Sequence, residues 1–196
     1  IWNTLGMTGG WSEKREKHSR VEFVLEDGSV FFNDQRNFGT IKFVNDSNLL
    51  VSKLRSLGPD MLASNISDSD FLKIMRRYQK KTLPEVLMNQ SAIAGVGNYI
   101  KAECLYLSKL SPHRIVSSVS DDELINLKSN ICSVMKESFE SGGATIRTYK
   151  GFNGESGEYG SRFIVYNQKQ DPAGNSVIKE KTKDGRNTHW VPEVQK

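Results

Sequence analysis

The segment Asn89-Gln-Ser-Ala-Ile-Ala-Gly-Val-Gly-Asn-Tyr-Ile100 says more about the fold than any other part of the chain. It places Gly95, Gly97 and Asn98 in a turn between two apolar helical segments. This predicts that several backbone N–H groups point outward at the start of the second helix, where they can bind an anion. A plain turn between two helices explains the same residues, so the neighbouring sequence has to decide.

A basic stretch precedes this turn, and residues 71–84 contain no acidic residue. Plotted on a helix, its apolar and basic side chains fall on opposite faces. A solvated helix face and a stripe that faces phosphates both fit this pattern, and the nearby glycine turn favours the phosphate interpretation. The apolar set is Phe71, Ile74, Met75 and Tyr78, and the basic set is Lys73, Arg76, Arg77, Lys80 and Lys81.

The composition of the 196 residues restricts the class of protein. Lysine and arginine number 27 against 23 acidic residues, a net charge of +4. No apolar run approaches the roughly 20 residues that a membrane span needs, so we expect no membrane partner. The only cysteines, Cys104 and Cys132, lie in apolar helical patterns, which fits buried thiols in a reducing compartment. With only three histidines besides, we predict no structural zinc.

Two Asp-Gly pairs predict two β-hairpins. The first pair, Asp27-Gly28, separates β-prone runs at 21–25 and 30–32. The second, Asp184-Gly185, separates runs at 177–181 and 187–191 and leaves Arg186 beside the tip. Further strands are predicted at 40–44 and 163–166, with a glycine-rich loop over 150–162.

Helical periodicity and capping signals predict the remaining elements. We expect helices at 49–57, from about 68 onward, at 84–89, 98–109 and 120–142, which together with the hairpins gives an α+β fold. Residues 120–123 form a capping box for the last helix. Its predicted buried stripe is Leu124, Leu127, Ile131, Val134, Met135 and Phe139.

Four segments in fixed order need one explanation: Leu5-Gly-Met-Thr-Gly9, Asp34-Gln-Arg-Asn-Phe-Gly39, the glycine turn ending at Asn98, and the hairpin with Arg186. Together they resemble the Fpg/Nei family of base-excision DNA glycosylases with lyase activity. The resemblance implies the remainder of an N-terminal β-sandwich at 1–48, a linker with a short helix at 49–66, a helix-two-turns-helix domain at 67–149, and a loop with a hairpin finger at 150–196.

The resemblance also implies roles for individual residues. Asn98 matches a phosphate-binding asparagine, and Lys80 belongs to the basic stretch expected to contact the DNA backbone. Three residues match those that fill the void left by a flipped base: Met7, Arg36 and Phe38. His18 corresponds to a DNA-contacting histidine, although a surface histidine at the start of a strand is the simpler interpretation.

The resemblance assigns the finger arginine, Arg186, to the phosphates of the lesion and to δ-elimination. Because a guanidinium is a poor acid at neutral pH, we expect it to stabilise charge on the leaving phosphate. Many relatives hold zinc with four finger cysteines, whereas residues 167–190 contain none. The finger therefore resembles the zincless type of plant, fungal and some viral or vertebrate Nei-like members. Asn37 stands where relatives often have an arginine.

The implied activity is removal of oxidised bases, followed by β,δ-elimination, by a monomer acting on double-stranded DNA that contains an oxidised base or an abasic site. The family nucleophile is an N-terminal proline next to a glutamate, and nothing here matches that pair. We therefore expect a catalytic N-terminal segment upstream of Ile1. The short glycine-rich loop favours oxidised pyrimidines and hydantoins, and the nucleus or the cytoplasm fits the reduced cysteines. The alternative is a non-catalytic nucleic-acid-binding protein, which would not need the void-filling set.

Overall fold

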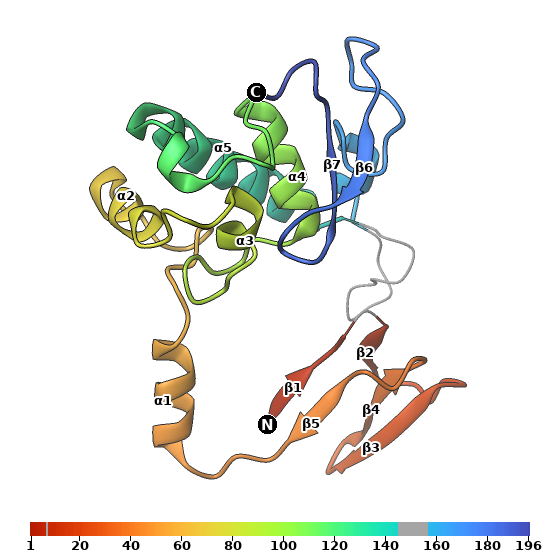
Figure 1. Cartoon of the computed structure of the whole chain (residues 1–196). Coiled ribbons are helices and arrows are strands. Elements are labelled where there is room, and N and C mark those ends of the chain that lie inside the picture. The colour runs from red at the N-terminus through yellow and green to blue at the C-terminus, as the bar shows by residue number, and fades with distance from the viewer. Residues whose placement is uncertain (7, 145–156) are drawn as a thin grey trace. The chain divides into compact units, whose positions relative to one another are not determined.

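The computed structural model describes residues 1–6, 8–144 and 157–196. These form two compact units (Figure 1). The first comprises Ile1–Ser52 and the described part of Glu140–Ser161, and the second comprises Lys53–Phe139 and Arg162–Lys196. Helices and antiparallel strands are both present, which confirms the α+β class. Among the described helices, none is both long enough and apolar enough to cross a membrane.

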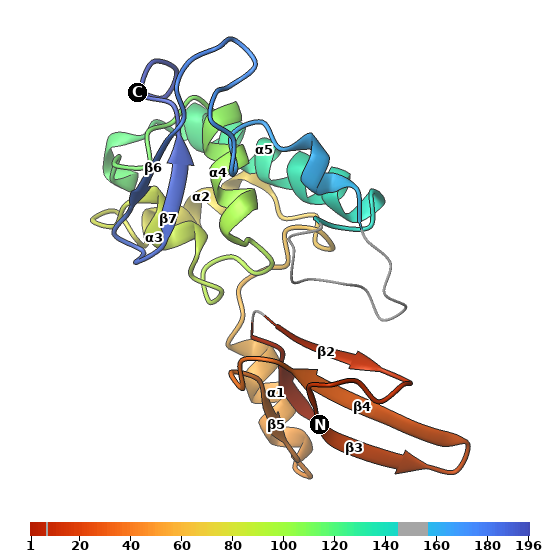
Figure 2. The ribbon, with the colours of Figure 1, turned by 90° about the vertical axis from the view of Figure 1, so that its right-hand side faces the viewer.

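The first unit contains two antiparallel sheets, visible from the side in Figure 2. One pairs β1 (Trp2–Thr4) with β5 (Thr40–Lys42), and the other has the strand order β2-β4-β3. Strand β5 is shorter than the predicted 40–44. The bounds of the other strands are Gly9–Ser12 for β2, Ser19–Leu25 for β3 and Gly28–Asp34 for β4.

The hairpin predicted from Asp27-Gly28 is confirmed, because Leu25 and Gly28 are register partners at the turn between β3 and β4. Gly28 has a φ of +141°, which a residue with a side chain rarely adopts. Aromatic rings supply the packing of this unit: the Trp11 ring lies 5.2 Å from that of Phe32 and 5.5 Å from that of Phe23. The predicted helix α1 (Ser47–Arg55) follows, with none of its residues buried.

The second unit is mainly helical, as Figure 1 shows. Capping side chains start α2 (Asp68–Arg76) and α5 (Asp121–Glu140) as the sequence predicts. Ser67 Oγ accepts from Asp70 N–H at the start of α2, and Ser120 and Glu123 exchange two hydrogen bonds at the start of α5. The helices are α2 (Asp68–Arg76), α3 (Leu83–Leu87), α4 (Asn98–Leu107) and α5 (Asp121–Glu140), with a short 3-10 turn at Val116–Ser118. A second 3-10 turn, Tyr159–Arg162, lies where the chain passes from the first unit back to the second.

Apolar side chains from these helices form the core, and Phe71, Met75, Leu124, Leu127 and Ile131 are fully buried. One member of the predicted stripe on α5 differs: the Phe139 side chain is 70% exposed. Phe139 lies in the last turn of α5, at the boundary of the second unit, where the helices of that unit no longer cover it.

The strand predicted at 163–166 is wrong. A strand needs a partner strand for its N–H groups, whereas three successive N–H groups here donate to one buried carboxylate of α4. Glu103 Oε2 accepts from Ile164 at 2.8 Å, and Glu103 Oε1 accepts from Val165 at 3.0 Å and Tyr166 at 2.7 Å. The segment is therefore a turn fastened to the helix.

The second predicted hairpin is confirmed. Strands β6 (Ile178–Lys181) and β7 (Asn187–Trp190) pair antiparallel, with Lys181 opposite Asn187 next to the tip. Strand β7 runs beside α4 in both ribbon views (Figures 1 and 2). Buried Ala102 and Val191 pack together at this contact, which joins the hairpin to the helix that follows the glycine turn.

Candidate nucleic-acid interface

The glycine turn is held in one conformation at the start of α4. Gly95 has a φ of +88°, and Gly97 is the extended N-cap residue. The side chain of Gln90 spans the turn, because its Oε1 accepts from Gly95 N–H and its Nε2 donates to the Val96 carbonyl, both at 3.0 Å. Helix geometry leaves the first-turn N–H groups of α4 without acceptors in the helix, the arrangement that is predicted from the sequence to suit an anion.

Asn98, the first residue of α4, connects this turn to the hairpin. Its Nδ2 donates to the carbonyl of Asn187 at 3.0 Å, and its Oδ1 is buried without a hydrogen-bond partner among the described residues. The predicted phosphate-binding asparagine and the residue next to Arg186 are therefore brought together, although 89 positions separate Asn98 from Asn187.

A second contact joins α4 to the hairpin tip. Lys101, fully buried one turn after Asn98, forms an ion pair with Asp184, with 2.7 Å between Nζ and Oδ2. The other carboxylate oxygen accepts from Thr182 Oγ1 at 2.5 Å. Arg186 itself is exposed, directly before β7, and its carbonyl accepts from Thr182 N–H at 3.0 Å.

Burial and pairing act against each other in this ion pair. Burial lowers the pKa of Lys101, and the contact with Asp184 opposes that shift. Burial raises the pKa of Asp184, but the hydrogen bonds from Lys101 and Thr182 outweigh it and leave that pKa below its ordinary value. In the neighbouring strand β7, burial lowers the pKa of His189 to about 4, so this side chain is neutral at pH 7.

In the first unit, Asp34 organises the loop that carries Arg36 and Phe38. The nearly buried carboxylate accepts from Gly39 N–H at 2.6 Å, Thr8 Oγ1 at 2.8 Å and Arg36 N–H at 3.1 Å. The hydrogen bond from Gly39, followed by those from Thr8 and the neighbouring N–H groups, lowers the pKa of Asp34. Because Thr8 belongs to the other glycine-containing loop, Asp34 joins the two predicted void-filling loops.

Two planar groups of the second loop, the Arg36 guanidinium and the Phe38 ring, lie against each other. The Arg36 guanidinium carbon lies 4.7 Å from the centre of the Phe38 ring, and Phe38 is 61% exposed. Met7 lies outside the described residues. His18 is half-buried, and its carbonyl accepts from Asp34 N–H at 2.9 Å. The structure thus brings Arg36, Phe38 and the backbone of His18 together around Asp34.

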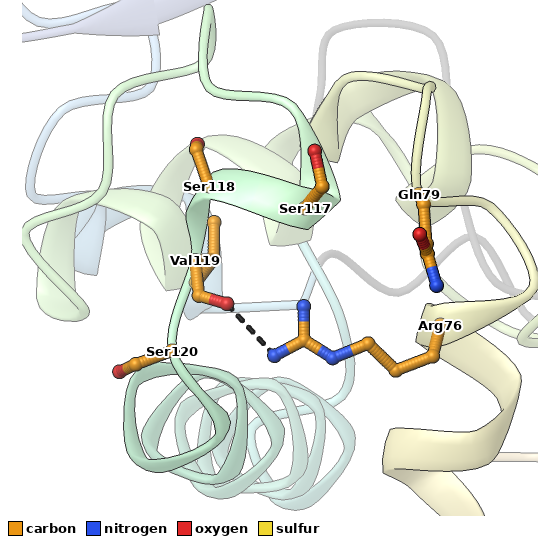
Figure 3. Close-up of a pocket in the computed structure, with 6 residues that line it drawn as sticks. All are labelled: Arg76, Gln79, Ser117, Ser118, Val119 and Ser120. Carbon is orange, nitrogen blue, oxygen red and sulfur yellow. Dashed lines mark hydrogen bonds between the residues drawn. The ribbon is translucent and has the colours of Figure 1, made fainter.

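The predicted basic stripe is not one helical face. Helix α2 ends at Arg76, where successive three-residue turns replace the helix, and exposed Lys80 lies in these turns. Arg76 faces the protein, because its guanidinium donates to the carbonyl of Val119 at 2.8 Å (Figure 3). It also donates to the carbonyl of Val116 at 2.8 Å and pairs with Asp121. It lines an open cavity of about 570 Å³ together with Gln79 and residues 117–120. Arg76 therefore anchors α2 to α5, and the prediction that it faces phosphates is wrong.

Sequence reasoning missed Asp34, Lys101 and Asp184 as organising residues. Asp34 opens a polar loop, a position where aspartate often accepts nearby N–H groups. Lys101 lies one turn after Asn98 and, like Glu103, is a charged residue within a mainly apolar helical segment, which was a signal for a buried partner. Nothing local identified Asp184 as that partner. Among the described residues, no group of three His, Cys, Asp or Glu side chains is arranged to bind a metal ion.

The turn, the helix and the hairpin define a helix-two-turns-helix protein with a β-hairpin finger. Comparison with known proteins agrees. Residues 57–150 match the formamidopyrimidine-DNA glycosylase H2TH domain, and residues 157–196 match the formamidopyrimidine-DNA glycosylase C-terminal domain. The chain belongs to the Fpg/Nei family of DNA glycosylases.

Individual relatives support this membership. The chain is 34% identical to the formamidopyrimidine-DNA glycosylase of Prochlorococcus marinus (strain MIT 9312), covering 92% of this chain and 63% of the relative. It is 31% identical to the enzyme of that name from Listeria monocytogenes serotype 4b, covering 94% and 68%. The crystal structure of MutM (Fpg) from Thermus thermophilus has a TM-score of 0.87 at 32% identity, covering 98% of this chain and 74% of that one. The chain thus spans less than two thirds of the length of the Prochlorococcus relative.

Proposed function

We propose that the protein is a base-excision-repair DNA glycosylase with lyase activity, and that the described residues hold the DNA. The observation that carries this proposal is the joining of α4 to the hairpin tip through Asn98 and Lys101. It places an exposed arginine beside a helix start whose N–H groups suit a phosphate. A solved Lactococcus lactis Fpg, 26% identical with a TM-score of 0.87, is a complex with DNA that contains an abasic site.

The residues proposed to contact DNA have two kinds of role. Asn98, the first turn of α4 and Arg186 bind phosphates, with Lys80 and His18 as further contacts to the DNA backbone. Arg36 and Phe38, together with Met7, fill the void when the damaged base leaves the helix, because stacked planar groups can replace an extruded base.

The proposed reaction begins when an amine of the full-length protein attacks the anomeric carbon of the sugar and the oxidised base departs. The resulting Schiff base allows β-elimination to break the bond to the 3′ phosphate and δ-elimination to break the bond to the 5′ phosphate. Arg186 stabilises the negative charge on the departing phosphate, because a guanidinium stays charged and offers several donors.

Borohydride trapping tests the reaction. The natural full-length protein is incubated with a duplex that contains one oxidised base or one abasic site, and borohydride then reduces any Schiff base to a stable adduct. We expect a covalent protein–DNA adduct. If no lesion gives one while the duplex still binds, the lyase proposal fails, and recovery of the duplex with its oxidised base intact would favour a non-catalytic nucleic-acid-binding protein.

The role of Arg186 has a matched control in the same turn. Arg186→Ala should weaken binding to abasic-site DNA about tenfold at near-physiological salt, the effect of losing about 1.4 kcal/mol of phosphate contact. Lys183→Ala removes an equal charge from an exposed position three residues earlier and should have a smaller effect. Equal losses in the two variants would mean that only general charge matters at the tip.

We propose oxidised pyrimidines and hydantoins as substrates. This proposal rests on the shortness of the glycine-rich loop, most of which lies outside the described residues. The named relatives are formamidopyrimidine-DNA glycosylases, so the excision rate of a formamidopyrimidine is the reference. Single-turnover excision rates are measured on matched duplexes that contain thymine glycol, a hydantoin or a formamidopyrimidine. Faster excision of the formamidopyrimidine than of the other two bases would contradict the proposal.

We also propose that the hairpin finger works without zinc, since residues 167–190 contain no cysteine. The contacts from Asp184 to Lys101 and Thr182 give the tip its support instead.

A further inference from the structure

The hairpin tip is held at two points on either side of Arg186. Before the arginine, Asp184 pairs with Lys101 at 2.7 Å, and after it the carbonyl of Asn187 accepts from Asn98 at 3.0 Å. Lys101 and Asn98 are three residues apart on α4 and therefore lie on the same face of the helix. One face of one helix thus fixes both ends of a four-residue segment.

The carboxylate of Asp184 also orders the tip internally. Its Oδ1 accepts from Thr182 Oγ1 at 2.5 Å and approaches the N–H of Arg186 at 3.5 Å. Thr182 in turn contacts Thr188 across the hairpin, with 2.7 Å between the hydroxyl oxygens. The side chains of Thr182 and Thr188 are buried, so these contacts are shielded from water.

Burying an ion pair has a desolvation cost, so its presence at the hairpin tip points to a role other than stability. Both charged side chains of the pair are almost completely buried, Lys101 at 0% and Asp184 at 2% exposure. Buried ion pairs contribute little net stability compared with apolar residues of similar size, whereas they fix geometry well. Arg186 itself is exposed and close to the pair.

From this arrangement we infer that Lys101 and Asp184 are positioning residues for Arg186. Their ion pair fixes the arginine at a set distance from the N-terminus of α4, so that the guanidinium and the helix N–H groups can bind phosphates of one DNA strand together. This inference rests on the proposed function, and it assigns the pair the supporting role for which relatives with finger cysteines use zinc.

The test has one part without DNA and one part with DNA, both on the natural full-length protein. Without DNA, amide hydrogen exchange is followed at Thr182 and Gly185, whose N–H groups donate to Arg186 and Thr182 within the tip. Asp184→Asn should speed exchange at these two amides about tenfold or more, as expected when a local opening becomes easier by about 1.4 kcal/mol. The matched control is Glu180→Gln, which disturbs contacts to His113 and Trp190 in the same hairpin but not the tip. Unchanged exchange in Asp184→Asn would overturn the inference.

With DNA, the dissociation constant for a duplex carrying a tetrahydrofuran abasic-site analogue is measured for a double-mutant cycle. Asp184→Asn alone should weaken binding about tenfold, but less than about twofold when Arg186→Ala is already present, because coupled residues are not additive. Additive losses would mean that the pair acts only through general stability and would overturn the inference. Lys101→Arg keeps the charge and should retain most of the affinity.

Misfolding is controlled by replacing both partners. Lys101→Met combined with Asp184→Leu removes the pair without leaving one buried charge alone, so the protein should fold. Its affinity for the abasic-site duplex should still match that of Arg186→Ala, and wild-type affinity would refute the inference. If Arg186→Ala itself leaves DNA binding unchanged, the proposed function of Arg186 fails, while the exchange experiment still decides whether the pair holds the tip.

Discussion

Glu103 offers the sharpest test of how α4 holds the rest of the second unit. Its side chain is completely buried, and its two oxygens accept three successive backbone N–H groups at 2.7–3.0 Å. Burial raises the pKa of Glu103, while the three N–H donors favour the carboxylate. The hydrogen bonds come from the segment that sequence patterns predict as a strand, so loss of the carboxylate should release this segment.

The two oxygens predict a graded series. In Glu103→Gln, the amide oxygen can keep the two bonds of Oε1 to Val165 and Tyr166, but the amide nitrogen then faces the N–H of Ile164. One charge-assisted bond is lost and two donors oppose each other, which should cost about 2 kcal/mol of unfolding free energy. Glu103→Leu leaves three buried N–H groups unsatisfied at about 1–3 kcal/mol each, so a loss of about 4 kcal/mol or more is expected.

Urea denaturation of the full-length protein measures both changes from the transition midpoint at constant slope. Glu193→Gln, an exposed position, is the control and should change stability by less than about 0.5 kcal/mol. Hydrogen exchange should locate the effect at Ile164, Val165 and Tyr166. If Glu103→Gln is as stable as Glu193→Gln, the carboxylate does not fasten the segment and the reasoning is refuted.

Three further predictions concern pH, the glycine turn and metal. Burial lowers the pKa of His189 from 6.5 to about 4, so between these values the unfolded chain binds a proton that the folded chain does not. The free energy of unfolding should therefore fall by about 2 kcal/mol between pH 7 and pH 5. In urea denaturation, His189→Gln should reduce this loss, and the same pH profile in the variant as in wild type would contradict the prediction. Gly95→Ala should cost about 1–2 kcal/mol in thermal unfolding, because Gly95 has a φ of +88° and a Cβ there would lie 2.7 Å from Met135 Cε. Gly97→Ala, at the extended N-cap residue with open space, is the control and should cost less than Gly95→Ala, about 0.5 kcal/mol for the poorer cap. A chelator should leave folding and DNA binding unchanged, and stoichiometric zinc in metal analysis of the purified protein would contradict the zincless proposal.

The sequence by itself determined the local elements of this protein. Both Asp-Gly hairpins and the capping box at Ser120 and Glu123 follow from contacts between near neighbours, and the structure contains each of them. The glycine turn before Asn98 also follows from local chemistry, since Gly95 adopts a backbone conformation that favours glycine. These are short-range effects, so the residues concerned carry the information themselves.

Only the tertiary structure decided which polar groups meet. Glu103 turns a predicted strand into a fastened turn about 60 residues away, and Arg76 leaves the predicted basic face to anchor α2 to the segment before α5. The partner of Lys101 lies 83 residues along the chain and that of Asn98 lies 89. A buried charge must find a partner, but its sequence position does not say which, because burial and pairing arise only when distant segments pack. The sequence thus predicted the turn and the arginine at the hairpin tip, and the packing of α4 against the hairpin decided that these two segments lie together.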